Sequence, residues 1–116
     1  MTAQRVLVTG ASGFIGRPIV AALLRAGYAV RAVTRRPVSF PNAVETVIIP
    51  DLKNSIDWAP ILQDVASIVH LAGPAHKRIP DAPYSEFDQI NWTATQRLAN
   101  AAKDAGVRRF IYMSSV

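Results

Sequence analysis

The chain opens with a short apolar run that leads directly into a turn rich in glycine. The run is Arg5-Val6-Leu7-Val8, and the turn has the sequence Thr-Gly-Ala-Ser-Gly-Phe-Ile-Gly. Glycine recurs at every third position of this turn, and we expect a helix from Phe14 to Ala26 to follow it. A strand, a glycine-rich turn and a helix in this order predict the first unit of a parallel α/β sheet.

Each of the three glycines has its own physical task in a turn that binds a dinucleotide. Gly10 lets the chain leave the strand, Gly13 removes a side chain where a pyrophosphate approaches, and Gly16 lets the helix pack closely. The helix start adds free N–H groups and the positive end of the helix dipole. A turn whose glycines serve only chain geometry is the alternative interpretation. The predicted phosphate-binding loop consists of Gly10, Ser12, Gly13, Phe14, Ile15 and Gly16.

Composition narrows the class of protein. A length of 116 residues indicates one domain over residues 1–116. A hydrophobic content of 50% indicates a folded chain rather than an intrinsically disordered one. The chain has no cysteine, which excludes disulfides and cysteine-based metal sites. No apolar run approaches the roughly 20 residues of a membrane span. The N-terminus also lacks the features of a signal peptide, so a cytoplasmic protein is expected.

The charge is positive but dispersed. Thirteen Lys and Arg residues oppose eight Asp and Glu residues, which gives a net charge of +5. The arginines are scattered along the chain rather than grouped on one helix face, so anionic small molecules explain them as well as a polyanion does. Nucleic-acid binding remains a weaker alternative, and a binding constant that falls steeply with salt would support it.

Predicted strands and helices alternate along the chain. The strands are expected at Arg5–Thr9, Ala29–Thr34, Ala43–Ile49, Ser67–Leu71 and Arg109–Met113, and the helices at Phe14–Ala26, Ile56–Gln63 and Ser85–Asp104. Short continuous apolar runs suit strands that are buried on both faces. The alternation implies right-handed crossovers and a doubly wound parallel sheet with five strands in the order 3-2-1-4-5.

The turn also resembles a known family motif. With Thr9 in front, it matches the Thr-Gly-x-x-Gly-x-x-Gly pattern of the short-chain dehydrogenase/reductase superfamily. It is most similar to the extended branch, the NAD(P)-dependent nucleotide-sugar epimerases and dehydratases. Two later segments also resemble this family, His70-Leu71-Ala72-Gly73 and Asn91-Trp92-Thr93-Ala94-Thr95. The resemblance covers nearly the whole chain and implies a Rossmann-like fold.

The end of the second strand predicts which dinucleotide is bound. A carboxylate at this place hydrogen-bonds the ribose 2′-hydroxyl and repels a 2′-phosphate. This chain has Thr34-Arg35-Arg36 there and no acid. A guanidinium suits a phosphate through paired, charge-assisted hydrogen bonds, so Arg35 favours NADP(H) over NAD(H), and Ser12 is within reach of the same phosphate. Solvated loop charges are the alternative interpretation.

The resemblance implies further cofactor contacts. An acid after the third strand accepts a hydrogen bond from the adenine amine in this family, and the next residue packs on the ring. Asp51 and Leu52 occupy these positions, although Asp51 as a plain turn acid is the alternative. Leu71, Ala72 and Gly73 are expected to run beside the cofactor ribose.

Two polar residues near these segments are expected to be structural. We expect His70 to be a packed strand residue rather than a catalyst. Asn91 is implied to bond backbone near the active site. No carboxylate stands at ligand spacing from His76, so a metal site is not expected.

The chain ends on a strand followed by two serines. In the resembling family, the second serine orients the reacting oxygen of the substrate, and Ser115 holds that position. A polar strand end is the alternative interpretation. The catalytic Tyr of the family, followed four residues later by Lys, has no counterpart in these 116 residues. We therefore expect no turnover from this chain alone and interpret it as a fragment that stops before the sixth strand.

The sequence supports two main functional hypotheses. The first is the NAD(P)-binding portion of a nucleotide-sugar epimerase, dehydratase or reductase, in which hydride moves at a sugar carbon. The second is a non-catalytic NADP(H)-binding redox sensor or assembly module. In either case we expect the fifth strand to be an exposed apolar edge and the isolated chain to form a homodimer, through this edge or through a crossing of Phe110–Val116.

Overall fold

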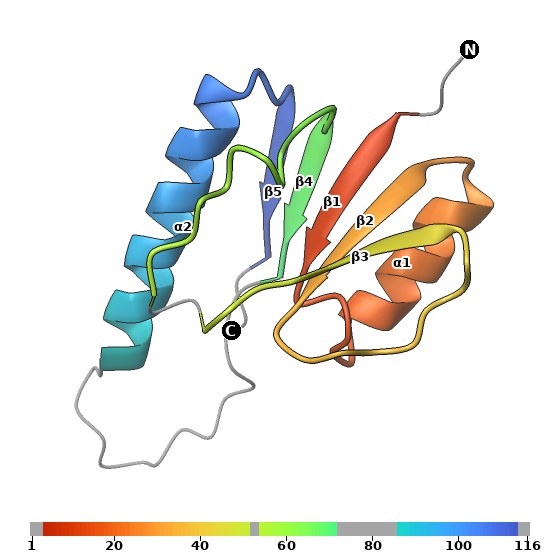
Figure 1. Cartoon of the computed structure of the whole chain (residues 1–116), viewed down its shortest axis with the longest axis horizontal. Coiled ribbons are helices and arrows are strands. Elements are labelled where there is room, and N and C mark those ends of the chain that lie inside the picture. Colours follow the sequence, from red (N-terminus) through yellow and green to blue (C-terminus); the bar gives the residue numbers. More distant parts are fainter. Residues whose placement is uncertain (1–3, 52–53, 72–85, 114–116) are drawn as a thin grey trace.

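A computed structural model shows a five-stranded parallel sheet with helices on both faces (Figure 1). The structure describes residues 4–51, 54–71 and 86–113, and the side chains of 86–91 are excluded from the description. The strands are β1 (Arg5–Thr9), β2 (Ala29–Thr34), β3 (Val44–Ile48), β4 (Ser67–His70) and β5 (Arg109–Tyr112). Their order is β3-β2-β1-β4-β5, which confirms the predicted doubly wound topology. The described helices are α1 (Gly16–Arg25) and α2 (Glu86–Asp104).

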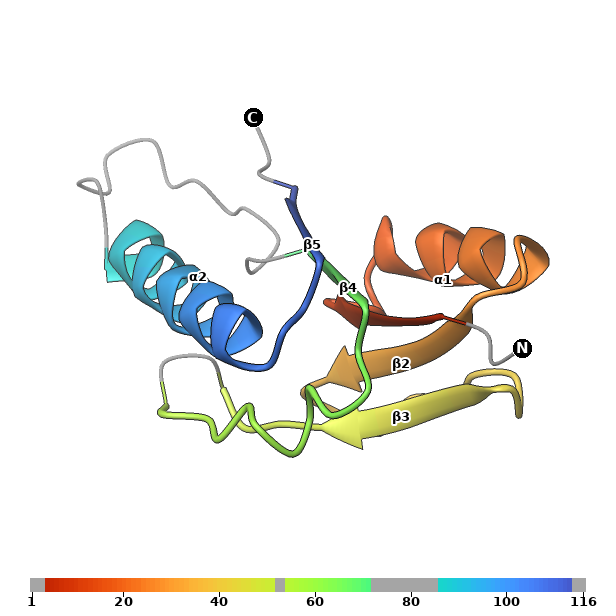
Figure 2. The same ribbon diagram turned by 90° about the horizontal axis from the view of Figure 1, so that it is seen from above.

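The two helices lie on opposite sides of the sheet (Figure 2). Side chains of β1 alternate between the two faces, as the pleat of a strand requires. Val6 and Val8 pack in the core with Val20 of α1, whereas Leu7 packs in the core with Leu98 of α2. Because β1 is central and buried on both faces, its carboxyl end has a fixed position relative to both helices.

The predicted helix over Ile56–Gln63 is wrong, because residues 59–64 form turns. One helical hydrogen bond forms, from Leu62 N to Trp58 O at 2.9 Å. Asp64 then takes a positive φ of 63°, which ends the turn and redirects the chain toward β4. Trp58 and Leu62 are both buried, so their spacing of four residues imitates a helical stripe.

Other predicted boundaries differ from the structure by one or two residues. α1 begins at Gly16 rather than Phe14, because the residues before Gly16 belong to the glycine turn. The third strand is shorter than predicted, and β4 and β5 end one residue early. These differences leave Leu71 directly after β4, beside the glycine turn.

A buried arginine anchors the connection between β3 and β4. Arg31 in β2 is 8% exposed, and its guanidinium donates to the carbonyl oxygens of Ile61 and Gln63. Its Nε lies 3.1 Å from Glu45 Oε2 as an ion pair, without the alignment of a hydrogen bond. Arg31 therefore holds the irregular segment against the same face of the sheet as α2.

Candidate dinucleotide site

The glycine turn is built by backbone hydrogen bonds at the carboxyl end of β1. Gly10 has a φ of 62°, which suits glycine and turns the chain out of the strand. Gly13 N then donates to Gly10 O at 3.1 Å, and Arg17 N donates to Gly13 O at 3.1 Å. These two hydrogen bonds connect the end of β1 to the first turn of α1.

Two of the three glycines are required by packing. A Cβ on Gly10 would collide with the carbonyl oxygen of Leu71, which follows β4. A Cβ on Gly16 would collide with the carbonyl oxygen of Gly10 and lie 2.7 Å from the carbonyl carbon of Ala11. The interpretation in which glycines serve chain geometry therefore accounts for Gly10 and Gly16.

Gly13 differs from the other two glycines. A Cβ there would meet one described atom outside its chain neighbours, Gly10 O at 3.4 Å, which is ordinary contact. Gly13 is also solvent-exposed. Since packing leaves room for a side chain at this position, the empty space above Gly13 is available to a ligand that approaches the backbone.

The start of α1 offers unused hydrogen-bond donors beside this space. The N-cap residue Ile15 makes no capping hydrogen bond with its side chain, and the first turn contains no acidic residue. No hydrogen bond between described residues uses the N–H of Phe14, Ile15 or Gly16. These N–H groups and the helix dipole together favour an anion at this point. Ser12, Phe14 and Ile15 are exposed around it.

The ends of β2 and β3 bring together two charged residues that the sequence analysis treated separately. Arg35 Nη1 lies 3.9 Å from Asp51 Oδ2, and both side chains are about half exposed. Thr34 donates its hydroxyl to Arg36 O at 2.7 Å, which shapes the turn that carries Arg35. A solvent-exposed ion pair of this length contributes little stability, so Arg35 is free to change partner.

The end of β4 carries a buried histidine. His70 is 0% exposed, and burial lowers its pKa from 6.5 to about 4. Its Nδ1 lies 2.6 Å from Thr9 Oγ1, and its Nε2 lies 3.1 Å from Thr95 Oγ1. The prediction that His70 is a packed strand residue is therefore confirmed. Sequence reasoning missed Thr9 and Thr95 as its partners, although Thr9 directly precedes the glycine turn.

Some predicted site residues lie outside the described part of the chain. They are Leu52, Ala72, Gly73 and Ser115, together with the side chain of Asn91. Within the described residues there is no group of three side chains that could hold a metal ion. None of the helices that the structure describes is long and apolar enough to cross a membrane.

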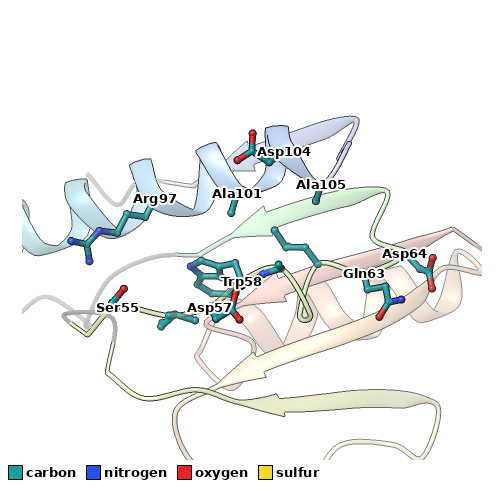
Figure 3. Close-up of a pocket in the computed structure, with 12 residues that line it drawn as sticks. Ser55, Asp57, Trp58, Gln63, Asp64, Arg97, Ala101, Asp104 and Ala105 are labelled. Carbon is teal, nitrogen blue, oxygen red and sulfur yellow. Dashed lines mark hydrogen bonds between the residues drawn. The ribbon is translucent and has the colours of Figure 1, made fainter.

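A separate groove of about 640 Å³ lies between α2 and the irregular segment before β4 (Figure 3). Trp58 and Leu62 line it from the segment, and Arg97 and Asp104 line it from α2. No residue of the predicted dinucleotide site contributes to its lining.

Comparison with known proteins agrees with the arrangement at the strand ends. A model of the NAD dependent epimerase/dehydratase family matches residues 6–116. The chain belongs to this family. The match includes the glycine turn, the strand ends with Arg35 and Asp51, and the buried His70.

Individual members of the family are similar over nearly the whole chain. A 3-beta-hydroxysteroid dehydrogenase from Mycolicibacterium neoaurum is 34% identical over 96% of this chain, and a UDP-glucose 4-epimerase from Vibrio cholerae is 32% identical over 97%. The solved structure of MoeE5 with UDP-glucuronic acid and NAD is 38% identical over 96% of the chain, with a TM-score of 0.77. The chain spans 32%, 35% and 36% of these proteins, about one third of their length.

Proposed function

We propose that this chain binds a nicotinamide dinucleotide and is the cofactor-binding portion of an epimerase, dehydratase or reductase that acts on nucleotide sugars. The observation that carries the proposal is the open space over Gly13 beside the unused N–H groups of Phe14, Ile15 and Gly16. Packing does not explain this combination, and it suits the pyrophosphate of a dinucleotide. The similar protein MoeE5 has NAD in its solved structure.

The remaining predicted residues complete a path for the cofactor along the carboxyl ends of the strands. Arg35 and Asp51 would hold the adenosine half, with Leu52 against the adenine ring. Leu71, Ala72 and Gly73 would run beside the cofactor ribose. When bound, the cofactor would supply hydride transfer at a sugar carbon, and the residues of this chain would bind and orient the cofactor.

We further propose that the chain prefers NADP(H) over NAD(H). Two features support this preference: the end of β2 has no acid, and Arg35 is exposed there and paired only weakly at 3.9 Å. A 2′-phosphate offers the guanidinium two parallel charge-assisted hydrogen bonds. NAD(H) is the alternative, and Arg35 and Arg36 are then solvated loop charges.

The substrate proposal rests on the relatives. UDP-glucose and UDP-glucuronic acid occur in solved structures of MoeE5, so we infer a nucleotide sugar for the protein to which this chain corresponds. Ser115 would orient the reacting oxygen of that sugar. The activity would be that of an isomerase or an oxidoreductase in the cytoplasm. The chain alone should show no turnover, because it has no Tyr followed four residues later by Lys.

We also propose that β5 mediates a homodimer. Ile111, Tyr112 and Met113 are 50%, 42% and 41% exposed, and among the strands that the structure describes, β5 pairs with β4 alone. An exposed apolar edge strand is a template for pairing with a second chain. Light scattering at high concentration tests this idea, and a monomeric mass throughout would rule it out.

Calorimetric titration with NADPH and NADH tests cofactor binding. The unmodified chain should bind at least one of the two. Gly13→Val should abolish binding, because its side chain fills the space where the pyrophosphate approaches. Ala21→Val, on the exposed side of α1, is a matched control that should bind as the unmodified chain does. Equal binding by the Gly13→Val and Ala21→Val variants would overturn the proposed site.

A further inference from the structure

A buried chain of polar groups joins three elements next to the glycine turn. Thr9 is the last residue of β1 and His70 is the last residue of β4, and the parallel register pairs them directly. They are 3% and 0% exposed, and their side chains meet at 2.6 Å. The second ring nitrogen of His70 reaches Thr95 of α2 at 3.1 Å. Pyrophosphate binding at the turn does not itself use these groups.

The direction of each hydrogen bond follows from the number of available donors. The N–H of Leu71 donates to Thr9 Oγ1 at 3.0 Å, which leaves the Thr9 hydroxyl hydrogen for His70 Nδ1. In the opposite tautomer, Nδ1–H would donate to Thr9, whose own hydrogen would then find no described acceptor in a buried place. The neutral ring therefore carries its proton on Nε2 and donates it to Thr95.

The surroundings of His70 keep the ring neutral. The rings of Phe110 and Tyr112 in β5 lie 6.0 and 5.7 Å from the imidazole. Tyr112 is the one titratable group among the described contacts of His70. Burial lowers the pKa of His70 to about 4, so Nδ1 remains an acceptor at physiological pH.

Thr9 controls the position of the backbone that follows β4. Its hydroxyl oxygen holds the N–H of Leu71, while the carbonyl of Leu71 lies so close to Gly10 that no Cβ would fit there. The start of the segment predicted to line the ribose is thus held against the turn predicted to bind the pyrophosphate. A change in the orientation of the Thr9 hydroxyl would disturb the glycine turn and the segment after β4 together.

We propose that His70 is a positioning residue for the dinucleotide site: its Nδ1 orients the Thr9 hydroxyl, which then holds Leu71 against Gly10. The contact between Nε2 and Thr95 belongs instead to the attachment of α2 and is not needed for cofactor binding. This inference rests on the proposed dinucleotide binding. It makes the two nitrogens of one buried ring unequal, and this inequality is measurable.

Two substitutions separate the two nitrogens. The amide oxygen of His70→Asn lies near the place of Nδ1 and accepts from Thr9, whereas the amide nitrogen of His70→Gln lies near the place of Nε2 and donates to Thr95. With the dinucleotide that binds more tightly, the dissociation constant should rise less than about 3-fold for His70→Asn. It should rise about 10-fold for His70→Gln, which corresponds to one lost hydrogen bond.

Substitutions of the partners give a second, independent measurement. Thr9→Val removes the hydroxyl and should weaken binding about 10-fold, while Thr9→Ser restores the hydroxyl and should restore affinity. Thr95→Val should leave affinity unchanged while lowering the midpoint of urea unfolding. If His70→Gln fails to fold, the two Thr9 variants decide the question in its place.

Nitrogen NMR of the His70 ring near pH 7 provides a readout that needs no cofactor. The proposal requires the proton on Nε2 and a bare Nδ1. A proton on Nδ1, or equal losses of affinity in His70→Asn and His70→Gln, would overturn the positioning role while leaving the proposed function intact. If the unmodified chain binds neither NADH nor NADPH, the proposed function fails and this inference fails with it.

Discussion

The two halves of the candidate site are built in different ways. At the glycine turn, contacts are short, buried and made largely by backbone: Gly10 lies against Leu71, and Gly16 lies against Gly10 and Ala11. At the ends of β2 and β3, the contact is an exposed ion pair at 3.9 Å between Arg35 and Asp51. The first half is rigid because packing leaves no alternative, whereas the second half is held by side chains that solvent can separate.

This difference suits two separate proposed roles, binding of the pyrophosphate by the first half and discrimination between cofactors by the second. A pyrophosphate is common to all dinucleotides, so a preformed backbone turn suits it. The 2′-position distinguishes NADP from NAD, and the proposed site would recognise it through the charge of exposed side chains. Substitutions in the first half should therefore change folding and all cofactor binding together, while substitutions in the second half should change cofactor preference with little effect on stability.

The largest effect is expected at Gly16. Gly16→Ala places a Cβ against the carbonyl of Gly10 and the backbone of Ala11, which cannot move without displacing β1. We expect a loss of at least about 3 kcal/mol in the free energy of unfolding, measured with urea.

Gly13→Ala is the matched control within the same turn. Its Cβ would meet one described atom, Gly10 O, at an ordinary 3.4 Å, so the loss should be below about 1 kcal/mol. Similar losses at Gly13 and Gly16 would mean that the turn is more yielding than its contacts indicate, and the contrast between the two halves of the site would collapse.

The next largest effect is the pH dependence of the free energy of unfolding that the buried His70 causes. Burial lowers the pKa of His70 from 6.5 to about 4, so an unfolded chain binds a proton between these pH values that the folded chain does not bind. The free energy of unfolding is therefore unaffected by His70 above pH 6.5 and falls by about 3 kcal/mol as the pH is lowered to 4. Urea unfolding at a series of pH values measures it.

His70→Asn removes the titrating group and retains an acceptor for Thr9. The free energy of unfolding of this variant should depend less on pH between 6.5 and 4 than that of the unmodified chain. Parallel pH profiles for the two proteins would show that His70 is not buried in the neutral form.

The sequence predicted the fold closely because the determinants are local. Short apolar runs and the alternation of strands with helices were sufficient to predict the five strands and their order in the sheet. The prediction of a helix over Ile56–Gln63 was wrong. Trp58 and Leu62 are both buried and four residues apart, as in a helix, but the segment makes only one helical hydrogen bond. That segment is held by Arg31 from β2, a long-range contact that periodicity does not reveal.

The candidate site was predictable to the extent that it depends on backbone. The position of the glycine turn followed from its motif, but the distinction between Gly13 and its two neighbours required knowledge of which atoms surround each one. The pairing of Arg35 with Asp51 and the contacts of Thr9 and Thr95 with His70 were not visible in sequence. They join residues that are far apart along the chain: strand register brings Thr9 to His70, and the packing of α2 on the sheet brings Thr95 to the same ring.

Arg35→Asp tests the exposed half directly. The substitution replaces the guanidinium that we propose for the 2′-phosphate with a carboxylate, which repels a 2′-phosphate and accepts a hydrogen bond from the 2′-hydroxyl of NADH. Affinity for NADPH should fall about 10- to 100-fold and affinity for NADH should not fall, as measured by calorimetry. Stability should change little, because the pair with Asp51 is exposed.

Arg36→Asp is the matched control, since Arg36 is also exposed and carries the same charge one residue later. It should weaken NADPH binding much less than Arg35→Asp. If the two variants lose NADPH equally, the effect is one of general charge, and the specific assignment of Arg35 is wrong.

The smallest effect is expected for Asp51→Asn, which removes one charge from the pair and keeps an oxygen that accepts a hydrogen bond. The free energy of unfolding should change by less than about 1 kcal/mol, and by less still at high salt. Because Arg35 no longer divides its charge between Asp51 and the cofactor, NADPH should bind about 2- to 3-fold more tightly, with NADH unchanged. Equal weakening of both dinucleotides would mean instead that the charge of Asp51 serves the proposed bond to the adenine, which both cofactors share, and does not compete for Arg35. The exposed half would then, like the proposed pyrophosphate site, recognise a common feature of the cofactors rather than discriminate between them.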